Sequence, residues 1–204
     1  AHVCTCFSPR DGVKPLYVVG AGSAGAVIAA RVSEAERHEV ILLEAGPDYR
    51  AAELPGDLLD GTKNSTEKHD WRYRFVANSA HDPVHLPRGR VTGGSSAVNT
   101  CIALRGQDYD YDEWAEHGGD HWRFAHCLPY FKRLENDLDF DNEWHGNEGP
   151  IAIRRHPPEE LVPVQRGFLA ACERLGMPKC SDHNDPNQSG AGPHAMNKVE
   201  GRRI

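Results

Sequence analysis

Three glycines near the start of the chain, Gly20, Gly22 and Gly25, have the spacing of a dinucleotide-binding loop. In the pattern G-x-G-x-x-G the first glycine allows a tight turn, the second lets the backbone approach a pyrophosphate, and the third lets a helix pack closely on a strand. The loop also contains Ser23 and Ala24. Because a helix N-terminus presents N–H groups and the positive end of its dipole, this loop predicts a site for a phosphate group.

An acidic residue follows at the distance that such a loop requires. The apolar run Val40–Leu43 leads directly into Glu44, 24 residues after Gly20, close to the expected spacing of about 20. A carboxylate at this place can accept hydrogen bonds from both hydroxyls of an adenosine ribose, which argues against a 2′-phosphate. The pattern therefore favours FAD or NAD over NADP, and by itself it leaves the choice between FAD and NAD open.

The elements around these residues form a βαβ unit. Leu16–Val19 is short and rich in β-branched residues, as expected for a buried strand, and the small residues of 26–31 favour a helix. Val40–Leu43 is the second strand. A strand, turn and helix without a ligand is the alternative for an isolated glycine motif. The ordered set of strand, loop, helix, strand and acid instead predicts an α/β dinucleotide-binding domain.

A second glycine-rich segment spans residues 88–106. Gly93 and Gly94 permit close backbone approach, Ser95 supplies a hydroxyl, Arg90 carries a fixed positive charge, and Asn99 can both donate and accept hydrogen bonds. This chemistry suits a second cradle for a phosphorylated, ring-bearing cofactor. A tight Gly-Gly loop without a ligand is the alternative when the segment is taken alone.

Together, the segments GAGSAGAVIAAR, LLEAGPD and GRVTGGSSAVNTCIALRG, the last followed by DYDEW, resemble the amino-terminal part of the glucose-methanol-choline (GMC) flavoprotein oxidoreductases. Two further matches are HGNEGP at 145–150 and the pair Asp182-x-Asn184. The resemblance runs from about residue 16 along nearly the whole chain. It implies FAD as the cofactor, an incomplete Rossmann-like FAD-binding domain, and the start of an α+β substrate-binding domain.

The resemblance also implies a division of the chain and an activity. Residues 1–150 would be the amino-terminal part of the FAD-binding domain, including the flavin loop 88–106, and residues 151–204 would begin the substrate-binding domain. The remainder of both domains would lie outside this chain. The implied reaction is oxidation of a small alcohol by hydride transfer to FAD, and the run Asn99–Ala103 is nearest to the choline-oxidising branch.

Individual cofactor contacts follow from the same resemblance. The first loop would hold the pyrophosphate and Glu44 the ribose, while Arg90 and the residues after it would run along the flavin. Some members attach FAD covalently through a histidine just before the asparagine; here that position is Val98, so we expect non-covalent FAD. The full predicted set is Gly20, Gly22, Ser23, Ala24, Gly25, Glu44, Ala45, Trp71, Arg90, Val91, Gly93, Gly94, Ser95, Asn99, Thr100, Cys101 and Ile102.

No residue of this chain is predicted to be the catalytic base. In the family, the proton-abstracting histidine lies near the carboxyl end, and no segment here resembles that region, so neither His183 nor His194 is given the role. We therefore expect a second polypeptide to supply the carboxyl-terminal half, with a truncated product as the alternative. Other chemistries of the scaffold, hydroxynitrile lyase or fatty-acid photodecarboxylase, and a non-catalytic flavin-binding fragment also stay open.

Other candidate sites are weaker. Metal sites are possible in principle at Cys4-x-Cys6, at the group His117, His121 and His126, and in a calcium-like loop at 182–187. The first is a single close pair, the second lacks a shared helix face, and the third lacks the central glycine and distal glutamate. We predict no metal at any of them.

Composition and pattern complete the expectations. The net charge of −7 argues against a nucleic-acid partner, because no basic stripe exists to neutralise phosphates. No apolar stretch reaches 18 residues, so no membrane span is expected. The patterns also predict an extended arm over 1–13, a half-exposed strand over 70–75, a helix capped by Asp108 or Asp110, a second helix from Trp122 to Phe131, a strand over 150–154 and a helix over 161–175.

Overall fold

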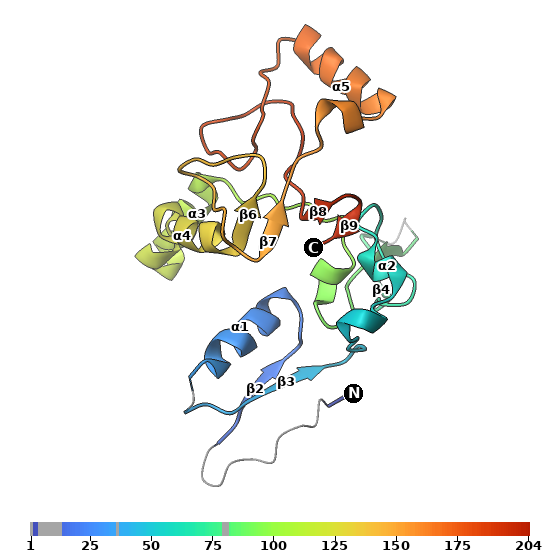
Figure 1. The fold of residues 1–204 in the computed structure, drawn as a ribbon, viewed down its shortest axis with the longest axis vertical. Helices are drawn as coiled ribbons and strands as arrows, with labels where there is room; N and C mark the ends of the chain where they lie inside the picture. Colours follow the sequence, from blue (N-terminus) through green and yellow to red (C-terminus); the bar gives the residue numbers. More distant parts are fainter. Residues whose placement is uncertain (1, 4–13, 36, 79–81) are drawn as a thin grey trace. The chain divides into compact units, whose positions relative to one another are not determined.

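The structure is a computed structural model, and it describes residues 2–3, 14–35, 37–78 and 82–204. The chain divides into two compact units, residues 1–100 and 101–204, which are described separately (Figure 1). This division does not coincide with the boundary expected near residue 150, which stays a prediction. Within the described residues, no helix has the length and apolar character needed to cross a membrane.

The first unit is built on the predicted βαβ arrangement. Strand β2 (Leu16–Val19) pairs in parallel with β3 (Val40–Glu44), with Leu16 opposite Val40, and helix α1 (Ser23–Ser33) connects them. The short strand β1 (His2–Val3) pairs antiparallel with the other side of β3. The predicted strands and helix are confirmed. Most of the predicted arm lies outside the described residues.

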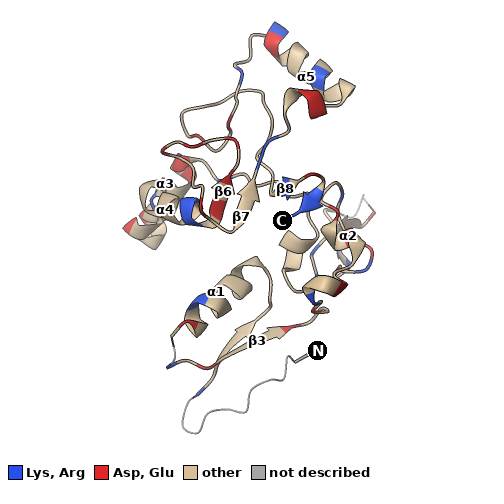
Figure 2. Ribbon diagram, in the orientation of Figure 1, with Lys and Arg blue, Asp and Glu red and all other residues tan. Residues whose placement is uncertain are grey.

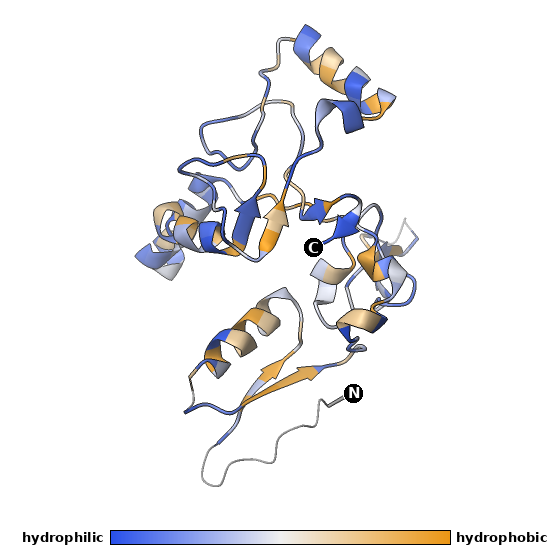
Figure 3. Cartoon of the chain, viewed as in Figure 1, coloured by the Kyte–Doolittle hydropathy of each residue, from blue (hydrophilic) through white to orange (hydrophobic). Residues whose placement is uncertain are grey.

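Small and apolar residues explain why α1 lies close to this sheet. Gly25 has no side chain between helix and strand, and Ala29 is buried on the same side. Charged side chains on α1 are confined to its last turn (Figure 2). Both β2 and β3 are strongly apolar (Figure 3). Strand β2 is nevertheless an edge of this sheet, and Val19 is 82% exposed there.

The rest of the first unit contains short elements: the 3₁₀ helices η1 (Ala51–Glu53) and η2 (Gly94–Ala97), helix α2 (Gly56–Leu59), and strands β4 (Tyr73–Phe75) and β5 (Val84–Leu86). The strands β4 and β5 form an antiparallel ribbon. The strand expected over 70–75 is therefore shorter, and begins at Tyr73. A small core joins Leu58, Val91 and Val98, which packs the second glycine-rich segment against α2.

The second unit has two parallel strands with helices around them: α3 (Asp108–Gly118), η3 (Asp120–Trp122), α4 (Phe124–Leu134), β6 (Glu135–Asp137), β7 (Ile151–Ile153), η4 (Pro158–Glu160), α5 (Pro163–Arg174), and the hairpin strands β8 (Lys198–Val199) and β9 (Arg202–Arg203). Strand β6 pairs in parallel with β7, and β8 pairs antiparallel with β9. The predicted helices and the strand near 150–154 are present with shifted ends.

Two local expectations in this unit need correction. The N-cap residue of helix α3 is Gln107 and not Asp108 or Asp110. Asp110 lies in the first turn of the helix, where its carboxylate accepts a hydrogen bond from the Gln107 N–H at 2.8 Å. Trp122 belongs to η3, since the chain is extended at Arg123 before α4 begins.

Helix α5 carries an exposed apolar stripe. Val164, Phe168 and the C-cap residue Leu175 are 76%, 64% and 81% exposed, and their spacing places them on one side of the helix and its end. Gly176 follows with φ +78°, a conformation that ends helices readily because glycine has no Cβ. The stripe is an exposed apolar surface of the second unit.

Candidate functional site

The two glycine-rich segments lie against each other in the first unit. Gly22 and Gly93 form a parallel bridge, and the Gly93 N–H donates to the Ala21 carbonyl at 2.7 Å. A Cβ on Gly94 would lie 2.8 Å from the Cα of Gly22, so no larger residue fits at this contact. Gly93 and Gly94 also have φ values of +95° and +57°. The contact requires glycine both for space and for backbone conformation.

The first loop is shaped for an anion. Gly20 has φ +92° and forms the turn after β2, and a Cβ on Gly25 would lie 1.9 Å from the Gly20 carbonyl oxygen. Among the described residues, no side chain caps the N-terminus of α1 at Gly22. The first N–H groups of a helix have no acceptor within the helix, so those of Ser23 and its neighbours are positioned to meet a phosphate group.

The Glu44 carboxylate holds the loop in place. Its Oε2 accepts a hydrogen bond from the Ala21 N–H at 2.8 Å, and its Oε1 accepts one from the Gly46 N–H at 2.8 Å. A carboxylate has about four acceptor positions, so both oxygens retain capacity for ribose hydroxyls. Glu44 therefore orders the phosphate loop in addition to the ribose contact expected from the sequence.

A cleft of about 880 Å³ opens beside these residues, within the usual range for a cofactor site. It is lined by these predicted residues: Gly20, Gly22, Ser23, Ala24, Gly25, Glu44, Ala45, Trp71, Gly94 and Ser95. It is also lined by residues that the sequence reasoning missed: Val19, Leu43, Tyr73, Leu86, Arg88 and Gly89.

The remaining predicted residues of the first unit do not line this cleft: Arg90, Val91, Gly93, Asn99 and Thr100. Val91 is only 1% exposed and belongs to the core, so its side chain supports the loop. The Arg90 guanidinium lies over the Trp71 ring, 5.3 Å from its centroid. Cys101 and Ile102 belong to the second unit, where Cys101 is buried and Ile102 is 50% exposed.

One wall of the cleft is aromatic. Trp71 and Tyr73 are stacked with ring centroids 5.9 Å apart, on one face of the segment that enters β4. The alternation of large and charged residues over 70–75 was the signal for this pair, since residues two apart share a face of an extended chain. Trp71 was predicted as a cofactor contact from the family resemblance, and Tyr73 was not predicted.

Asp70 fixes the segment that carries this wall. Its Oδ1 accepts from the Arg72 N–H and from His85 Nε2 at 2.5 and 3.0 Å, and its Oδ2 accepts from the Arg88 N–H at 2.8 Å. Burial alone raises the pKa of Asp70, but these hydrogen bonds outweigh burial and hold the pKa below its ordinary value. Asp70 therefore stays ionised at neutral pH and joins the aromatic wall to the second glycine-rich segment.

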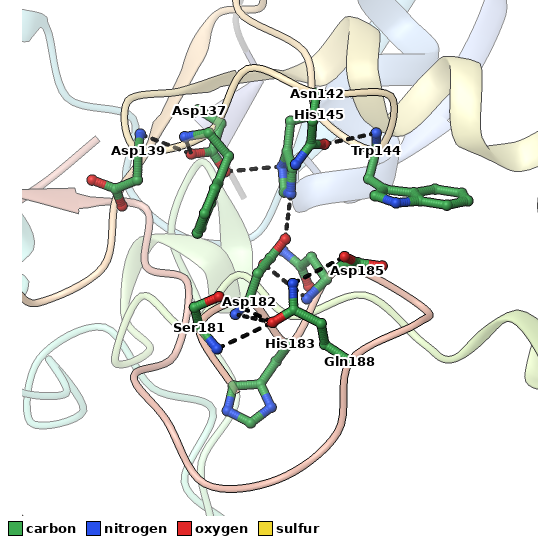
Figure 4. A network of polar contacts seen from close by, with 12 residues as sticks. Asp137, Asp139, Asn142, Trp144, His145, Ser181, Asp182, His183, Asp185 and Gln188 are labelled. Atoms are coloured by element: carbon green, nitrogen blue, oxygen red, sulfur yellow. Dashed lines mark hydrogen bonds and ion pairs between the residues drawn. The ribbon is translucent and has the colours of Figure 1, made fainter. Parts of the chain in front are cut away.

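The second unit brings together the two distant motifs HGNEGP and Asp182-x-Asn184. His145 Nε2 lies 2.6 Å from Asp182 Oδ2, and His145 Nδ1 lies 2.9 Å from Asp137 Oδ2 (Figure 4). His145 Nδ1 also lies 3.0 Å from Glu135 Oε1. The side chain of His145 is fully buried. Because both ring nitrogens face carboxylates, both must donate, and His145 is protonated.

The charges of this buried cluster balance. Arg155 Nη1 and Nη2 lie 2.7 Å from Asp137 and from Asp182 respectively, and Arg105 Nη2 lies 2.5 Å from Glu135. Protonated His145 is the third cation for three carboxylates. Burial alone lowers the pKa of His145, but the hydrogen bonds to Asp137, Asp182 and Glu135 raise it to about 10.

Glu135, Asp137 and His145 are close enough to share one metal ion. A protonated imidazole has no lone pair for a metal, and Arg105 and Arg155 already compensate the carboxylates. The described residues therefore form an ionic cluster with a structural role. No other group of histidine, cysteine and carboxylate ligands within the described residues is compact enough for an ion, including His117, His121 and His126.

Comparison with known proteins agrees with this geometry. Residues 15–204 match the GMC oxidoreductase family. The chain belongs to the GMC oxidoreductase family. It is 39% identical over 188 residues to the oxygen-dependent choline dehydrogenase of Vibrio vulnificus and 36% identical over 203 residues to the mitochondrial choline dehydrogenase of Mus musculus. These matches cover 91% of this chain but only 34% and 32% of the two relatives.

Solved structures of two oxidases have the same fold. The pyridoxine 4-oxidase from Mesorbium loti superposes with a TM-score of 0.82 at 32% identity, over 93% of this chain and 38% of that protein. A formate oxidase superposes with a TM-score of 0.76 at 24% identity, which is a likeness of fold alone. The Rossmann-like fold and FAD as the cofactor, both expected from the sequence, are confirmed.

The residues present fit FAD. The contact between Gly22 and Gly94 keeps the backbone accessible to a pyrophosphate, the uncapped start of α1 offers N–H donors, and Glu44 keeps acceptor capacity for a ribose. The adjoining cleft and the aromatic pair Trp71 and Tyr73 provide room and an apolar surface for a ring system. The assignment of FAD contacts to individual residues stays a prediction.

Proposed function

We propose that this chain is the FAD-binding part of a GMC-type flavoprotein that oxidises an alcohol. The observation that carries the proposal is the contact between the two glycine-rich segments beside Glu44, because it forms one cofactor cleft from two separate motifs. Choline and pyridoxine, named in the descriptions of two relatives, both carry a primary hydroxyl group. A small primary or secondary alcohol is the corresponding substrate class.

The proposed reaction converts the alcohol to an aldehyde or ketone. The carbon that bears the hydroxyl loses a hydride and the hydroxyl loses a proton to a base, so that a C=O bond forms. When bound, FAD accepts the hydride. This chain binds and orients the cofactor through the glycine loops and Glu44, and the proton-accepting group comes from the carboxyl-terminal region that the relatives possess.

Two exposed apolar surfaces support completion by that carboxyl-terminal region. The edge strand β2 exposes Tyr17 and Val19 by 63% and 82%, although parallel strands are normally buried on both sides. Helix α5 exposes its stripe of Val164, Phe168 and Leu175. The chain spans only about a third of the curated relatives. We propose that the missing two thirds cover both surfaces, as a second polypeptide or as a continuation of this one.

We further propose that FAD is held without a covalent bond. The position at which some family members carry the linking histidine is Val98, whose side chain is 3% exposed and packs against Leu58 and Val91. A buried aliphatic side chain offers no nucleophile for a bond to the flavin. The attachment in this protein therefore rests on hydrogen bonds and packing.

Anaerobic addition of small alcohols to the native protein tests the proposed reaction. Bleaching of the flavin absorbance, with formation of an aldehyde or ketone, is the expected result. Cleavage of a cyanohydrin without bleaching would indicate the hydroxynitrile lyase type, and light-dependent loss of CO₂ from a fatty acid the photodecarboxylase type. A flavoprotein that performs none of these reactions would be a non-catalytic flavin-binding component, and the proposal would be wrong.

A further inference from the structure

Residues 101–105 form the beginning of the second unit, directly after the second glycine-rich segment. The Cys101 carbonyl accepts a hydrogen bond from the Asn197 N–H at 2.8 Å, and the Ala103 N–H donates to the Ala195 carbonyl at 2.9 Å. Cys101 has φ +63°, a strained conformation for a non-glycine residue that persists only where the surroundings enforce it. These hydrogen bonds therefore fix the backbone conformation on both sides of Ile102.

The side chain of Asn184 forms two further hydrogen bonds with the backbone of this stretch. The Arg105 N–H donates to Asn184 Oδ1 at 2.9 Å, and Asn184 Nδ2 donates to the Ala103 carbonyl at 3.0 Å. The amide of Asn184 therefore pairs with residues 103 and 105 as the backbone of a neighbouring strand would. Asn184 is only 4% exposed, so neither bond competes freely with water.

The ionic cluster holds Asn184 in turn. The Asn184 N–H donates to Asp182 Oδ1 at 3.0 Å, and the same carboxylate receives Arg155 Nη2 at 2.7 Å and His145 Nε2 at 2.6 Å. Arg105 also returns to the cluster through its side chain, which reaches Glu135 Oε1 at 2.5 Å and the Trp144 carbonyl at 2.7 Å. The stretch is anchored at Arg105 by both backbone and side chain.

We propose that Asn184 is a positioning residue that sets the conformation of Cys101–Arg105 and thereby orients Cys101 and Ile102, which are predicted to run along the flavin. The proposal rests on the proposed function for the role of residues 99–102, but the anchoring itself is independent of it. The pair Asp182-x-Asn184 then has two jobs in this chain. Asp182 belongs to the ionic cluster and binds the Asn184 N–H. Asn184 in turn fixes the backbone that follows the second glycine-rich segment.

Hydrogen exchange of the full chain, with and without added FAD, tests the anchoring. In the wild-type protein the Arg105 N–H is expected to exchange slowly, because its acceptor is a buried side chain; fast exchange would overturn the proposal. In Asn184→Ala, exchange at residues 103–106 is expected to rise about tenfold or more, while residues 16–46 stay unchanged. A uniform rise over the whole chain would show a merely structural role and would also overturn it.

Two further variants sharpen the result. Asn184→Asp keeps an acceptor for the Arg105 N–H and is expected to retain most of the protection at that amide. Asn187→Ala, an exposed asparagine in the same loop, is the matched control and is expected to behave as the wild type. With FAD bound, Asn184→Ala is expected to shift the visible absorption band of the flavin. A wild-type protein that binds no FAD would refute the proposed function, while the exchange data would still decide the anchoring.

Discussion

Gly25 is the residue at which a larger side chain would disturb the phosphate loop most directly. A Cβ there would lie 1.9 Å from the Gly20 carbonyl oxygen, which is backbone and has no room to move without opening the turn. We expect Gly25→Ala to abolish FAD binding and to destabilise the first unit by several kcal/mol, as overpacked sites do. Isothermal titration with FAD and urea unfolding measure the two effects.

Gly167→Ala is the matched control. Gly167 lies inside α5, and a Cβ at this position would meet no atom within 4 Å. Alanine favours a helix over glycine by about 1 kcal/mol, so this variant is expected to bind FAD normally and to be slightly more stable. Equal FAD affinity in Gly25→Ala and Gly167→Ala would contradict the geometry of the loop.

His145 gives the protein a pH dependence of stability. Its pKa is raised from 6.5 to about 10 by three carboxylates that outweigh burial, so its contribution is complete below about pH 6.5 and is lost as pH rises through 10. The pKa values of Glu135, Asp137 and Asp182 are lowered instead, so their contribution is lost as pH falls below about 4. Stability should be greatest between these limits.

The corresponding variant is His145→Gln. Removing one partner of a buried ionic cluster costs about 3–5 kcal/mol, because the remaining charges are left uncompensated. We expect this loss in the free energy of unfolding at pH 6.5, measured in urea, and a much flatter decline between pH 7 and 10 than in the wild type. Glu160→Gln is a control, since it removes the exposed ion pair of Glu160 with His156 and should lower stability far less than His145→Gln. A wild-type stability that is constant from pH 6.5 to 10 would show that His145 is not protonated.

At the scale of elements, α5 exposes an apolar stripe that no segment of the described residues covers. Phe168 is 64% exposed, so Phe168→Ser is expected to change the free energy of unfolding of this chain by less than about 0.5 kcal/mol. The same change, combined with Val164→Ser and Leu175→Ser, is expected to weaken association with the carboxyl-terminal region at least tenfold. Co-purification of the two parts, quantified by native mass spectrometry, measures this. Unchanged association would place the carboxyl-terminal region elsewhere.

The elements near the glycine loop were predictable because their signals are local. Strand, turn and helix from Leu16 to Ser33 each follow from residue type and spacing, and the structure has them at the expected places. The starts of α3 and α4 were not predicted correctly, because several polar residues compete for each cap and only the packed structure selects Gln107 and Arg123.

The candidate site was predictable only in part for a related physical reason. Both glycine motifs are visible in the sequence, but their contact at Gly22 and Gly94 depends on tertiary structure. Asp70 carries no motif, and its role follows from three bonds to segments up to 18 residues away. The hydrogen bond between His145 and Asp182 likewise joins residues 37 positions apart, and no local sequence pattern predicts it.

At the scale of the whole molecule, the chain supplies a cofactor cleft and the beginning of a second unit. The curated relatives that it matches are about three times as long. In the proposed function, the base that the reaction needs comes from the region that they have beyond this match. The exposed edge of β2 and the stripe on α5 are the surfaces at which the remaining polypeptide would be expected to pack. We therefore expect this chain to determine how the cofactor is bound.

The most direct test of the account is the flavin content of the native protein before and after acid precipitation. We predict a yellow protein with about one FAD for each copy of this chain, and release of all the flavin as intact FAD into the supernatant. Flavin that stays with the precipitated chain would contradict the non-covalent attachment inferred from Val98. A colourless protein that binds NAD and not FAD would contradict the central claim.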